Sequence, residues 1–418
     1  MKLNRSFLIR WTALIVASVT MFGNYYLYDS VAYVAIQLKE TLGFTDRQYG
    51  MLYSAYSVAA VLILFWGGIF VDRYGTRISI LIFGFICTIA GFVTAFGGSI
   101  LSITAGRFVL GLGAEPLIVA VTVAIAKWFK GKALGFALGI NLLVARLGSS
   151  TVDWSPNWGA RFYTGWQMPL VVAAIIGLLC TLGAIVYFFI EYRAEKRSWL
   201  SGPSETDKLK FSELLSFNKS FWYITLLCVT FYSAIFPFRG FAPKFFQEAH
   251  GISNALAGRL MSWLPITAMI ATPLIGLLID KIGKRASMML LGSIIIVPVF
   301  LMMIYTDITL YIPVAMIGIA FSLIPAVMWP SVAYIVDEKK LGSAYSLMFI
   351  LQQIGVAGFA FLIGSANDYS NASTANPSGY NLGMWLFSIL GFLALFFSFM
   401  LRKVEKGPHA HGLEKGSL

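Results

Sequence analysis

Long apolar stretches recur along the whole chain, and they constrain its fold more than any other feature. Each covers about 20 residues or more, the length that a helix needs to cross a hydrocarbon core of roughly 30 Å. With 58% hydrophobic residues, 12% charged residues and a mean hydropathy of +0.77, the chain is far more apolar than a water-soluble domain. The sequence therefore predicts an all-α membrane protein that has no separate soluble domain.

The apolar stretches divide the chain into twelve expected transmembrane helices. We expect the helices near residues 11–37, 49–71, 78–99, 101–127, 132–153 and 169–190, and near residues 221–246, 255–280, 286–305, 309–336, 341–364 and 380–402. The longest polar insertion separates these two sets of six. The expected domains are an N-terminal six-helix bundle over 1–190, a cytoplasmic linker over 191–220, a C-terminal six-helix bundle over 221–402 and a cytoplasmic tail over 403–418.

The positive charges are concentrated on one side of the expected membrane. The chain has 31 Lys and Arg residues, and this division places 23 of them on the side of the N-terminus. Five lie on the other side: Lys39, Arg47, Arg161, Lys244 and Arg259. Because loops rich in Lys and Arg resist translocation, the asymmetry predicts that both termini are cytoplasmic. It also accounts for the net charge of +12 without a nucleic acid partner.

An internal repeat links the two sets of helices. The landmarks Gly68, Asp72, Arg73, Gly75 and Arg77 recur 208 positions later as Gly276, Asp280, Lys281, Gly283 and Arg285. Both copies fall in a short turn between the second and third helices of their half. The glycines there permit tight turns and close helix approach, and the charged residues can pair and bond helix ends. A shift of almost half the chain length indicates two homologous halves.

This repeated pattern resembles the signature of the major facilitator superfamily. The resemblance implies the major facilitator fold, two pseudo-symmetric six-helix bundles that rock about a central cavity. The implied function is transport across a membrane. Because that fold supports many cargoes, the fold alone does not name a substrate.

Five charged residues fall inside the expected helices: Asp29, Arg107, Glu115, Arg146 and Arg239. A charge at the centre of an apolar helix costs roughly 2.5–3.5 kcal/mol on insertion scales, so each needs a partner, water or a function. Glu115 and Arg146 lie near the midpoints of neighbouring antiparallel helices and so share a depth. They form either a buried structural ion pair or the two ends of a site that binds a zwitterion at the midplane.

Several segments favour the second interpretation, because they resemble the lysosomal dipeptide uniporter family. They include residues 24–29, 106–115, 127–132 and 145–149 in the first half, and 236–238, 329–334 and 341–345 in the second. The resemblance implies that Glu115 and Arg146 hold the two termini of a dipeptide. Arg239 departs from the apolar residue of that family, which puts an identical substrate choice in doubt.

The other intramembrane charges have two interpretations each. Arg107 is part of a common fourth-helix pattern, and we expect it to orient neighbouring backbone and polar groups, while glycines at 106, 111 and 113 indicate tight helix packing. Asp29 and Arg239 occupy equivalent depths in the two halves. They form either an outer gate or two separate charges at a wet cavity mouth.

Aromatic and amide side chains complete the candidate site. A peptide site needs apolar walls with hydroxyl or amide groups, and the expected helices offer these at several positions. The candidates are Tyr25, Tyr26, Tyr53, Tyr56, Trp329, Gln352 and Gln353. Aromatic residues are abundant at 15%, so any one of them is more often a packing residue than a ligand.

The mode of transport is open between several classes. Resemblance favours facilitated uniport of short peptides, but Glu115 or Asp29 in an apolar cavity can also carry a proton. A carrier of another zwitterion, an exchanger of organic anions and a non-transporting sensor are the alternatives. The chain offers no nucleophile and base in a catalytic arrangement, so we do not expect an enzyme.

Cysteine and histidine usage adds no further site. Cys87, Cys180 and Cys228 lie in apolar runs and predict no disulfide, and the three histidines do not form a metal-binding cluster. We assign no metal and no cofactor. We expect a small-molecule cargo and a lipid bilayer as partners, and a monomer as the working state.

The start of the chain bears on localisation. Basic residues precede the first apolar stretch as in a signal peptide, but no small-residue cleavage site follows a short apolar core, so we expect the first helix to be retained. The N-terminal segment before it is too short for the sorting tail of animal lysosomal members. We therefore expect a bacterial inner membrane.

Overall fold

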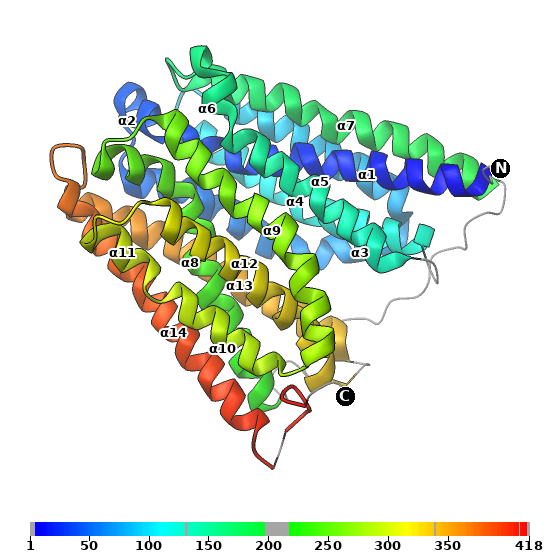
Figure 1. Cartoon of the computed structure of the whole chain (residues 1–418). Coiled ribbons are helices and arrows are strands. Elements are labelled where there is room, and N and C mark those ends of the chain that lie inside the picture. The colour runs from blue at the N-terminus through cyan, green and yellow to red at the C-terminus, as the bar shows by residue number, and fades with distance from the viewer. Residues whose placement is uncertain (1–4, 130–132, 197–216, 338–339, 409, 416–418) are drawn as a thin grey trace. The chain divides into compact units, whose positions relative to one another are not determined.

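The computed structural model describes residues 5–129, 133–196, 217–337, 340–408 and 410–415. These residues are almost entirely helical (Figure 1). The elements are α1 (Arg5–Asp29), η1 (Ser30–Tyr33), α2 (Ala35–Leu42), α3 (Asp46–Phe96), α4 (Ile100–Phe129), α5 (Leu134–Asp153), α6 (Ser155–Trp158), η2 (Ala160–Phe162), α7 (Gln167–Lys196), α8 (Lys219–His250), α9 (Asn254–Ile282), α10 (Arg285–Ile296), α11 (Val299–Tyr305), α12 (Tyr311–Ile335), α13 (Leu341–Tyr369), η5 (Pro377–Tyr380) and α14 (Asn381–Glu405). Residues 197–216, most of the expected linker, lie outside the described part of the chain.

Ten helical segments of the described chain are long and apolar enough to cross a membrane. With α1 and the part of α3 that precedes Gly75, they make the twelve expected helices, so the expected fold class is confirmed. Several expected boundaries differ from the structure. The first expected helix, near 11–37, divides into α1, η1 and the start of α2. The second and third helices merge into α3, which is broken at Gly75 by a φ of 78°, and the ninth divides into α10 and α11 next to Pro298. The positive φ explains why a glycine is needed at this turn.

The chain groups into two compact units. The first comprises Met1–Phe44 and Ala55–Thr206, and the second comprises Thr45–Ser54 and Asp207–Leu418. The start of α3 therefore belongs to the second unit and the rest of α3 to the first.

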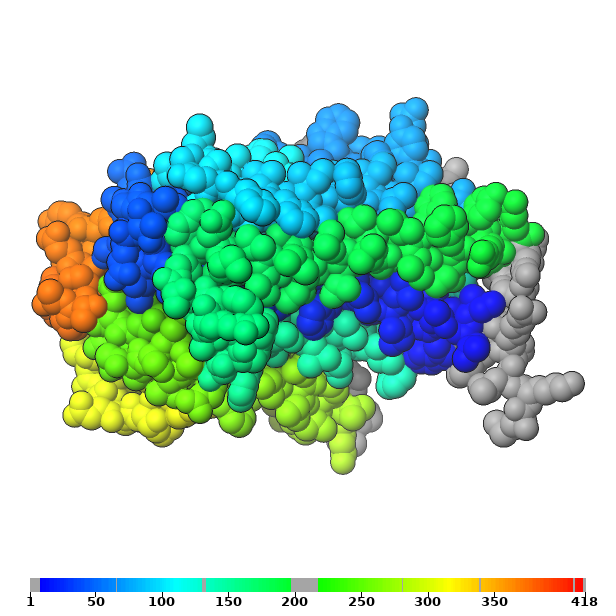
Figure 2. Space-filling model, turned by 90° about the horizontal axis from the view of Figure 1, so that it is seen from above, coloured from blue at the N-terminus to red at the C-terminus, as the bar shows by residue number. Residues whose placement is uncertain are grey.

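In the first unit, α1 is the central helix. It packs along both α5 and α7, as the ribbons show (Figure 1). The space-filling view shows α7, in green, beside the dark blue α1 (Figure 2). Alanines, leucines and aromatic rings from α1, α3, α4, α5 and α7 form one continuous buried core.

In the second unit, α8 takes the corresponding place. It packs against α13 and α14, while α12 packs against α9 and α10. Phenylalanines of α8 fill this interior, and the ring of Phe238 meets those of Phe300 and Phe387 at 5.2 and 5.7 Å between centroids.

Glycines allow the close helix contacts of the first unit. A Cβ at Gly111 would lie 2.3 Å from the Tyr56 carbonyl oxygen, and one at Gly106 would lie 2.4 Å from the Thr94 hydroxyl. A Cβ at Gly113 would lie 2.9 Å from the Cys87 sulfur. The tight packing predicted for these three glycines is confirmed.

Gly148 offers a direct test of such packing. A Cβ there would lie 2.4 Å from the Phe22 carbonyl oxygen of α1, so Gly148→Ala must push α5 away from α1. We expect a loss of about 1–3 kcal/mol in the free energy of unfolding, measured by SDS titration. Gly139→Ala on the same helix is the matched control, because a Cβ there meets no described atom within 4 Å. Equal stability of the two variants would contradict the packing argument.

Candidate functional site

Glu115 is a buried charged residue of α4 in the first unit. Its side chain is only 6% exposed, and its carboxylate accepts a hydrogen bond of 2.7 Å from the Tyr56 hydroxyl of α3. The small residue Gly111 makes this bond possible, because it lets α4 approach the backbone of α3 at Tyr56. A buried carboxylate is thus held by a hydroxyl donor, which lowers the cost of keeping it in an apolar interior.

Arg107 lies about two turns before Glu115 on α4 and also contacts the Tyr56 ring. Its guanidinium carbon lies 5.2 Å from the ring centroid of Tyr28 and 5.8 Å from that of Tyr56. The side chain is 1% exposed and donates a hydrogen bond of 3.1 Å to the Leu27 carbonyl oxygen of α1. These contacts agree with the expectation that Arg107 orients backbone and neighbouring groups.

Arg146 on α5 lies close to the same region. Its guanidinium carbon is 5.9 Å from the ring centroid of Tyr25 on α1. The Tyr25 hydroxyl also lies within electrostatic range of Glu115 and Asp29. The structure therefore gathers an acid, a base and tyrosine hydroxyls in one region of the first unit, which is the set of groups that a zwitterion requires.

Two other predicted residues of the first unit have structural contacts. Asp29 is 6% exposed and accepts a hydrogen bond of 2.6 Å from the Ser149 hydroxyl of α5. Tyr26 is 1% exposed and belongs to the same hydrophobic core as Tyr56. Sequence reasoning missed Tyr28, whose ring lies 4.7 Å from that of Tyr56. Its spacing of three residues from Tyr25 on α1 was the available signal.

The remaining aromatic and amide candidates belong to the second unit. The Tyr53 hydroxyl lies 3.2 Å from that of Tyr49, and the indole of Trp329 donates a hydrogen bond of 3.0 Å to the Tyr232 hydroxyl. Gln352 accepts a long contact of 3.5 Å from the Cys228 thiol. Gln353 is buried at 6% exposure. The rings of Tyr53, Tyr232 and Trp329 are suited to an apolar wall that also carries polar groups.

The expected outer gate joins residues of different units. Asp29 belongs to the first unit and Arg239 to the second, where Arg239 is 7% exposed on α8. The gate therefore stays a prediction.

A buried charge cluster that the sequence did not predict lies in the second unit. Lys244 of α8 forms an ion pair with Asp46, the first residue of α3, and lies 3.9 Å from Glu248. Glu248 in turn accepts a hydrogen bond of 2.5 Å from Tyr380. We expected Lys244 within the helix at 221–246, near its outer end; in the structure α8 continues to His250, and Lys244 is 2% exposed.

Further hydrogen bonds fix the start of α3 in the second unit. The Asp368 carboxylate accepts two bonds of 2.8 Å from the backbone amides of Asp46 and Arg47. The Tyr49 hydroxyl donates to the Gly240 carbonyl at 2.9 Å, and the Ser54 hydroxyl to the Ala357 carbonyl at 2.7 Å. A carboxylate at a helix N-terminus satisfies free amides and complements the helix dipole.

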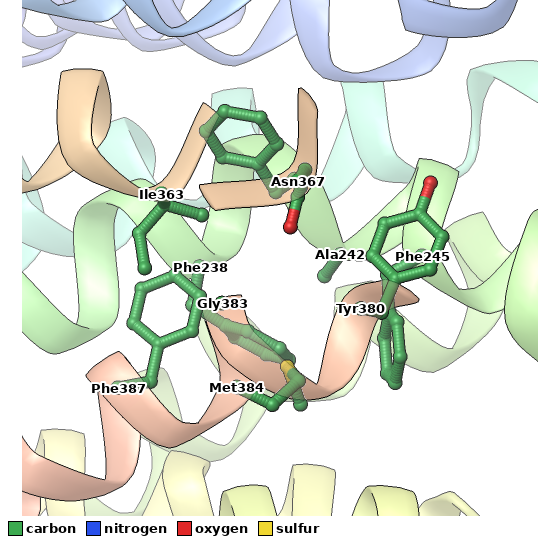
Figure 3. A pocket seen from close by; sticks show the side chains of 10 residues that line it. Phe238, Ala242, Phe245, Ile363, Asn367, Tyr380, Gly383, Met384 and Phe387 are labelled. Atoms are coloured by element: carbon green, nitrogen blue, oxygen red, sulfur yellow. The ribbon is translucent and has the colours of Figure 1, made fainter. Parts of the chain in front are cut away.

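A small pocket lies next to this cluster (Figure 3). Its walls are mainly aromatic and aliphatic, and the amide oxygen of Asn367 points into it. The residues that line it are Phe238, Phe241, Ala242, Phe245, Ile363, Asn367, Tyr380, Gly383, Met384 and Phe387. No predicted site residue is among them.

The first copy of the repeated motif is tied to the end of α7. Arg77 forms an ion pair of 2.5 Å with Glu195, and the Thr76 hydroxyl donates a bond of 2.6 Å to Glu191. Lys127 of α4 bridges both glutamates at 2.7 and 2.9 Å. Charged residues of the turn thus bond a helix end, although the acids come from α7 rather than from the motif itself.

The other motif residues differ in their surroundings. Gly75 and Gly283 have φ of 78° and 69°, which fits the expected tight turns. A Cβ at Gly68 or Gly276 would meet no described atom within 4 Å, so close helix approach, which we expected there, does not explain these two glycines. Asp72 and Arg73 are exposed, as is Lys281 in the second copy. Arg285 lies 4.9 Å from the Tyr334 ring centroid, and the side chain of Asp280 lies outside the described part.

Comparison with known proteins decides the family. The model of the Major Facilitator Superfamily matches residues 13–360 and 239–417. The chain belongs to the major facilitator superfamily. It is therefore an integral membrane transporter of small molecules rather than an enzyme.

Individual relatives agree on the fold and differ in cargo. The lysosomal dipeptide transporter MFSD1 of Bos taurus is 31% identical over 360 residues, which cover 83% of this chain and 77% of that protein. The hexuronate transporter of Escherichia coli is 22% identical over 270 residues, 62% of each chain. Among solved structures, the nucleoside transporter NupG matches with a TM-score of 0.72 at 14% identity, over 96% of this chain and 99% of that one. The resemblance inferred from the sequence is confirmed.

Proposed function

We propose that this transporter carries dipeptides and similar short zwitterionic peptides. Glu115 binds the ammonium group of the peptide and Arg146 binds its carboxylate. The observation that supports the proposal is the gathering of Glu115 and Arg146 around the tyrosines of the first unit, with Glu115 held at 2.7 Å by Tyr56. Opposite charges at a shared depth match the two charged ends of a peptide.

The relatives support the same cargo. The name of the bovine relative states that it transports dipeptides, and its similarity extends over 83% of this chain. The side chains of Tyr25, Tyr56, Tyr53, Trp329 and Gln353 would then contact the peptide backbone and side chains. Rings with hydroxyl or amide groups suit a ligand whose ends are charged and whose side chains vary.

The transport cycle that we propose is facilitated uniport by alternating access. The two units exchange their accessible sides around the peptide, and the repeated turns at Gly75 and Gly283 change their contacts as this happens. The distribution of Lys and Arg supports an orientation with both termini in the cytoplasm.

A second candidate cargo is a small organic anion. The hexuronate relative favours it, because the name of that protein specifies an anionic sugar acid. Arg146 alone would suffice for such a cargo. Glu115 argues against it, since a buried carboxylate at the same depth would repel an anion.

Counterflow in proteoliposomes tests the proposal. We expect labelled dialanine to enter vesicles preloaded with unlabelled dialanine at least tenfold faster than labelled alanine or glucuronate enters vesicles preloaded with the same compound. Facilitated uniport predicts that a pH gradient leaves the net uptake of dialanine unchanged. Uptake of glucuronate without uptake of dialanine would reject the peptide and favour the anion, while accumulation driven by an inward proton gradient would reject uniport.

A further inference from the structure

The last described residues of the chain pack back onto the second unit. We call residues 410–415 the C-terminal tail. The side chain of Leu413 is completely buried, although it follows the last helix by eight residues. Burying an isolated leucine side chain contributes favourably only if the surrounding backbone is also held in place. Its burial therefore indicates a specific docked conformation.

The tail covers the N-terminus of α10. The residue that precedes this helix, Lys284, has a φ of 45° and makes no capping bond with its side chain. The tail supplies acceptors instead: the Lys284 and Ala286 amides each donate at 3.4 Å to carbonyls of Lys415 and Leu413. The Glu414 carboxylate accepts 2.6 Å and 2.8 Å bonds from the Ser287 amide and hydroxyl. A carboxylate at this position also complements the helix dipole.

A second carboxylate holds the other side of the tail. Glu405, the last residue of α14, is 3% exposed and accepts a bond of 2.6 Å from Ser220. It also accepts bonds from the backbone amides of His411 at 2.8 Å and Leu413 at 3.3 Å. The ring of His411 also lies 3.1 Å from the amide of Asn218, the N-cap of α8, so the tail is bonded to the ends of α8, α10 and α14.

The two copies of the repeated motif are tied in different ways. Ser287 follows Gly283 by four residues, as Ser79 follows Gly75 in the first copy. In the first unit the acids that hold the turn, Glu191 and Glu195, are part of helix α7. In the second unit Glu414 lies beyond α14, on a segment that is not part of a helix. The bonds of Glu191 and Glu195 to the first turn break only if α7 moves. The bonds of Glu414 to Ser287 can break while every helix stays folded.

We propose that the C-terminal tail is an intramolecular latch on the turn between α9 and α10, with Glu414 as the residue that closes it. Release of the latch frees the start of α10 and lets this turn rearrange during the transport cycle. The latch is independent of which small molecule the protein carries.

Hydrogen exchange of the full-length protein in lipid nanodiscs tests the latch without any substrate. In the wild-type protein, we expect amides over residues 283–290 to exchange at least tenfold faster than those over 75–82, because only the former can open locally. Glu414→Gln keeps one acceptor oxygen but removes the negative charge that strengthens both bonds to Ser287 and attracts Arg402, and it should speed exchange over 283–290 by about another tenfold, with 75–82 unchanged. The matched control is Lys415→Gln, because the Lys415 side chain is exposed and only its backbone contacts α10.

A crosslink provides the reverse experiment. The three native cysteines are fully buried, so Ser287→Cys with Glu414→Cys introduces the accessible pair. When the disulfide is closed, we expect slow exchange over 283–290 and dialanine counterflow reduced several-fold, and both should recover with a reductant. Unchanged exchange in Glu414→Gln, or an equal change in Lys415→Gln, would overturn the latch, as would normal counterflow with the disulfide closed. Absence of dialanine counterflow in the wild type would reject the proposed cargo, and the exchange rates would still decide the latch.

Discussion

Glu115→Gln should reduce dipeptide counterflow at least about 100-fold while leaving the protein folded. Glutamine keeps the shape of the side chain and can still accept the hydrogen bond of the Tyr56 hydroxyl, which is 2.7 Å long in the structure. It cannot offer a negative charge to an ammonium group. Loss of one desolvated charge pair costs about 3 kcal/mol, which corresponds to roughly a 100-fold change. The measurement is the initial rate of labelled dialanine counterflow in proteoliposomes that contain equal amounts of folded protein.

Modified substrates separate the role of Glu115 from a general loss of activity. An N-acetylated dipeptide lacks the ammonium group, so its transport is slow in the wild type and Glu115→Gln should change it by less than about threefold. Arg146→Gln provides the mirror experiment, in which a dipeptide with a C-terminal amide is the insensitive substrate. If Glu115→Gln slowed the free and the acetylated dipeptide by the same factor, the carboxylate would not be the ammonium ligand.

Lys244→Met should lower the free energy of unfolding by about 3–5 kcal/mol, because it removes one partner of a buried ion pair. Lys244 is 2% exposed and Asp46 is 3% exposed, so water cannot solvate the charge that remains when its partner is removed. The second carboxylate oxygen of Asp46 already has no hydrogen bond in the described structure. SDS titration of the purified protein measures the loss.

Two further variants make this test specific. The double variant Asp46→Asn with Lys244→Met removes both charges of the closer pair and should recover part of the lost stability, since the charge that remains, Glu248, still accepts a bond from Tyr380. Lys403→Met changes an exposed lysine of α14 and should stay within about 0.5 kcal/mol of the wild type. A double variant as unstable as Lys244→Met alone would show that the buried charges are not the cause.

The sequence was sufficient for features that depend on local pattern. Apolar stretches of helical length predicted the transmembrane segments, and the repeat at Gly75 and Gly283 predicted two turns that the structure places at positive φ. The cost of an intramembrane charge singled out Glu115 and Arg146, because few residues of that kind occur in such helices. The presence of Tyr25 near both of them was also expected from its helix.

Features that depend on distant partners were not accessible in the same way. Lys244 and Asp46 are 198 positions apart, and Glu414 and Ser287 are 127 apart, so no local pattern joins them. A local signal was available only for Lys244 and Glu248. These two residues are four positions apart on a helix that continues to His250, which places both on one face of α8.

The burial of Leu413 has a practical consequence for anyone who produces this protein. A purification tag or fluorescent reporter fused to the C-terminus would add its bulk within a few residues of a side chain that has no solvent exposure. Such a fusion would favour release of residues 410–415 and weaken their contacts with the start of α10. Handles for immobilisation or imaging are therefore better introduced away from residues 410–415.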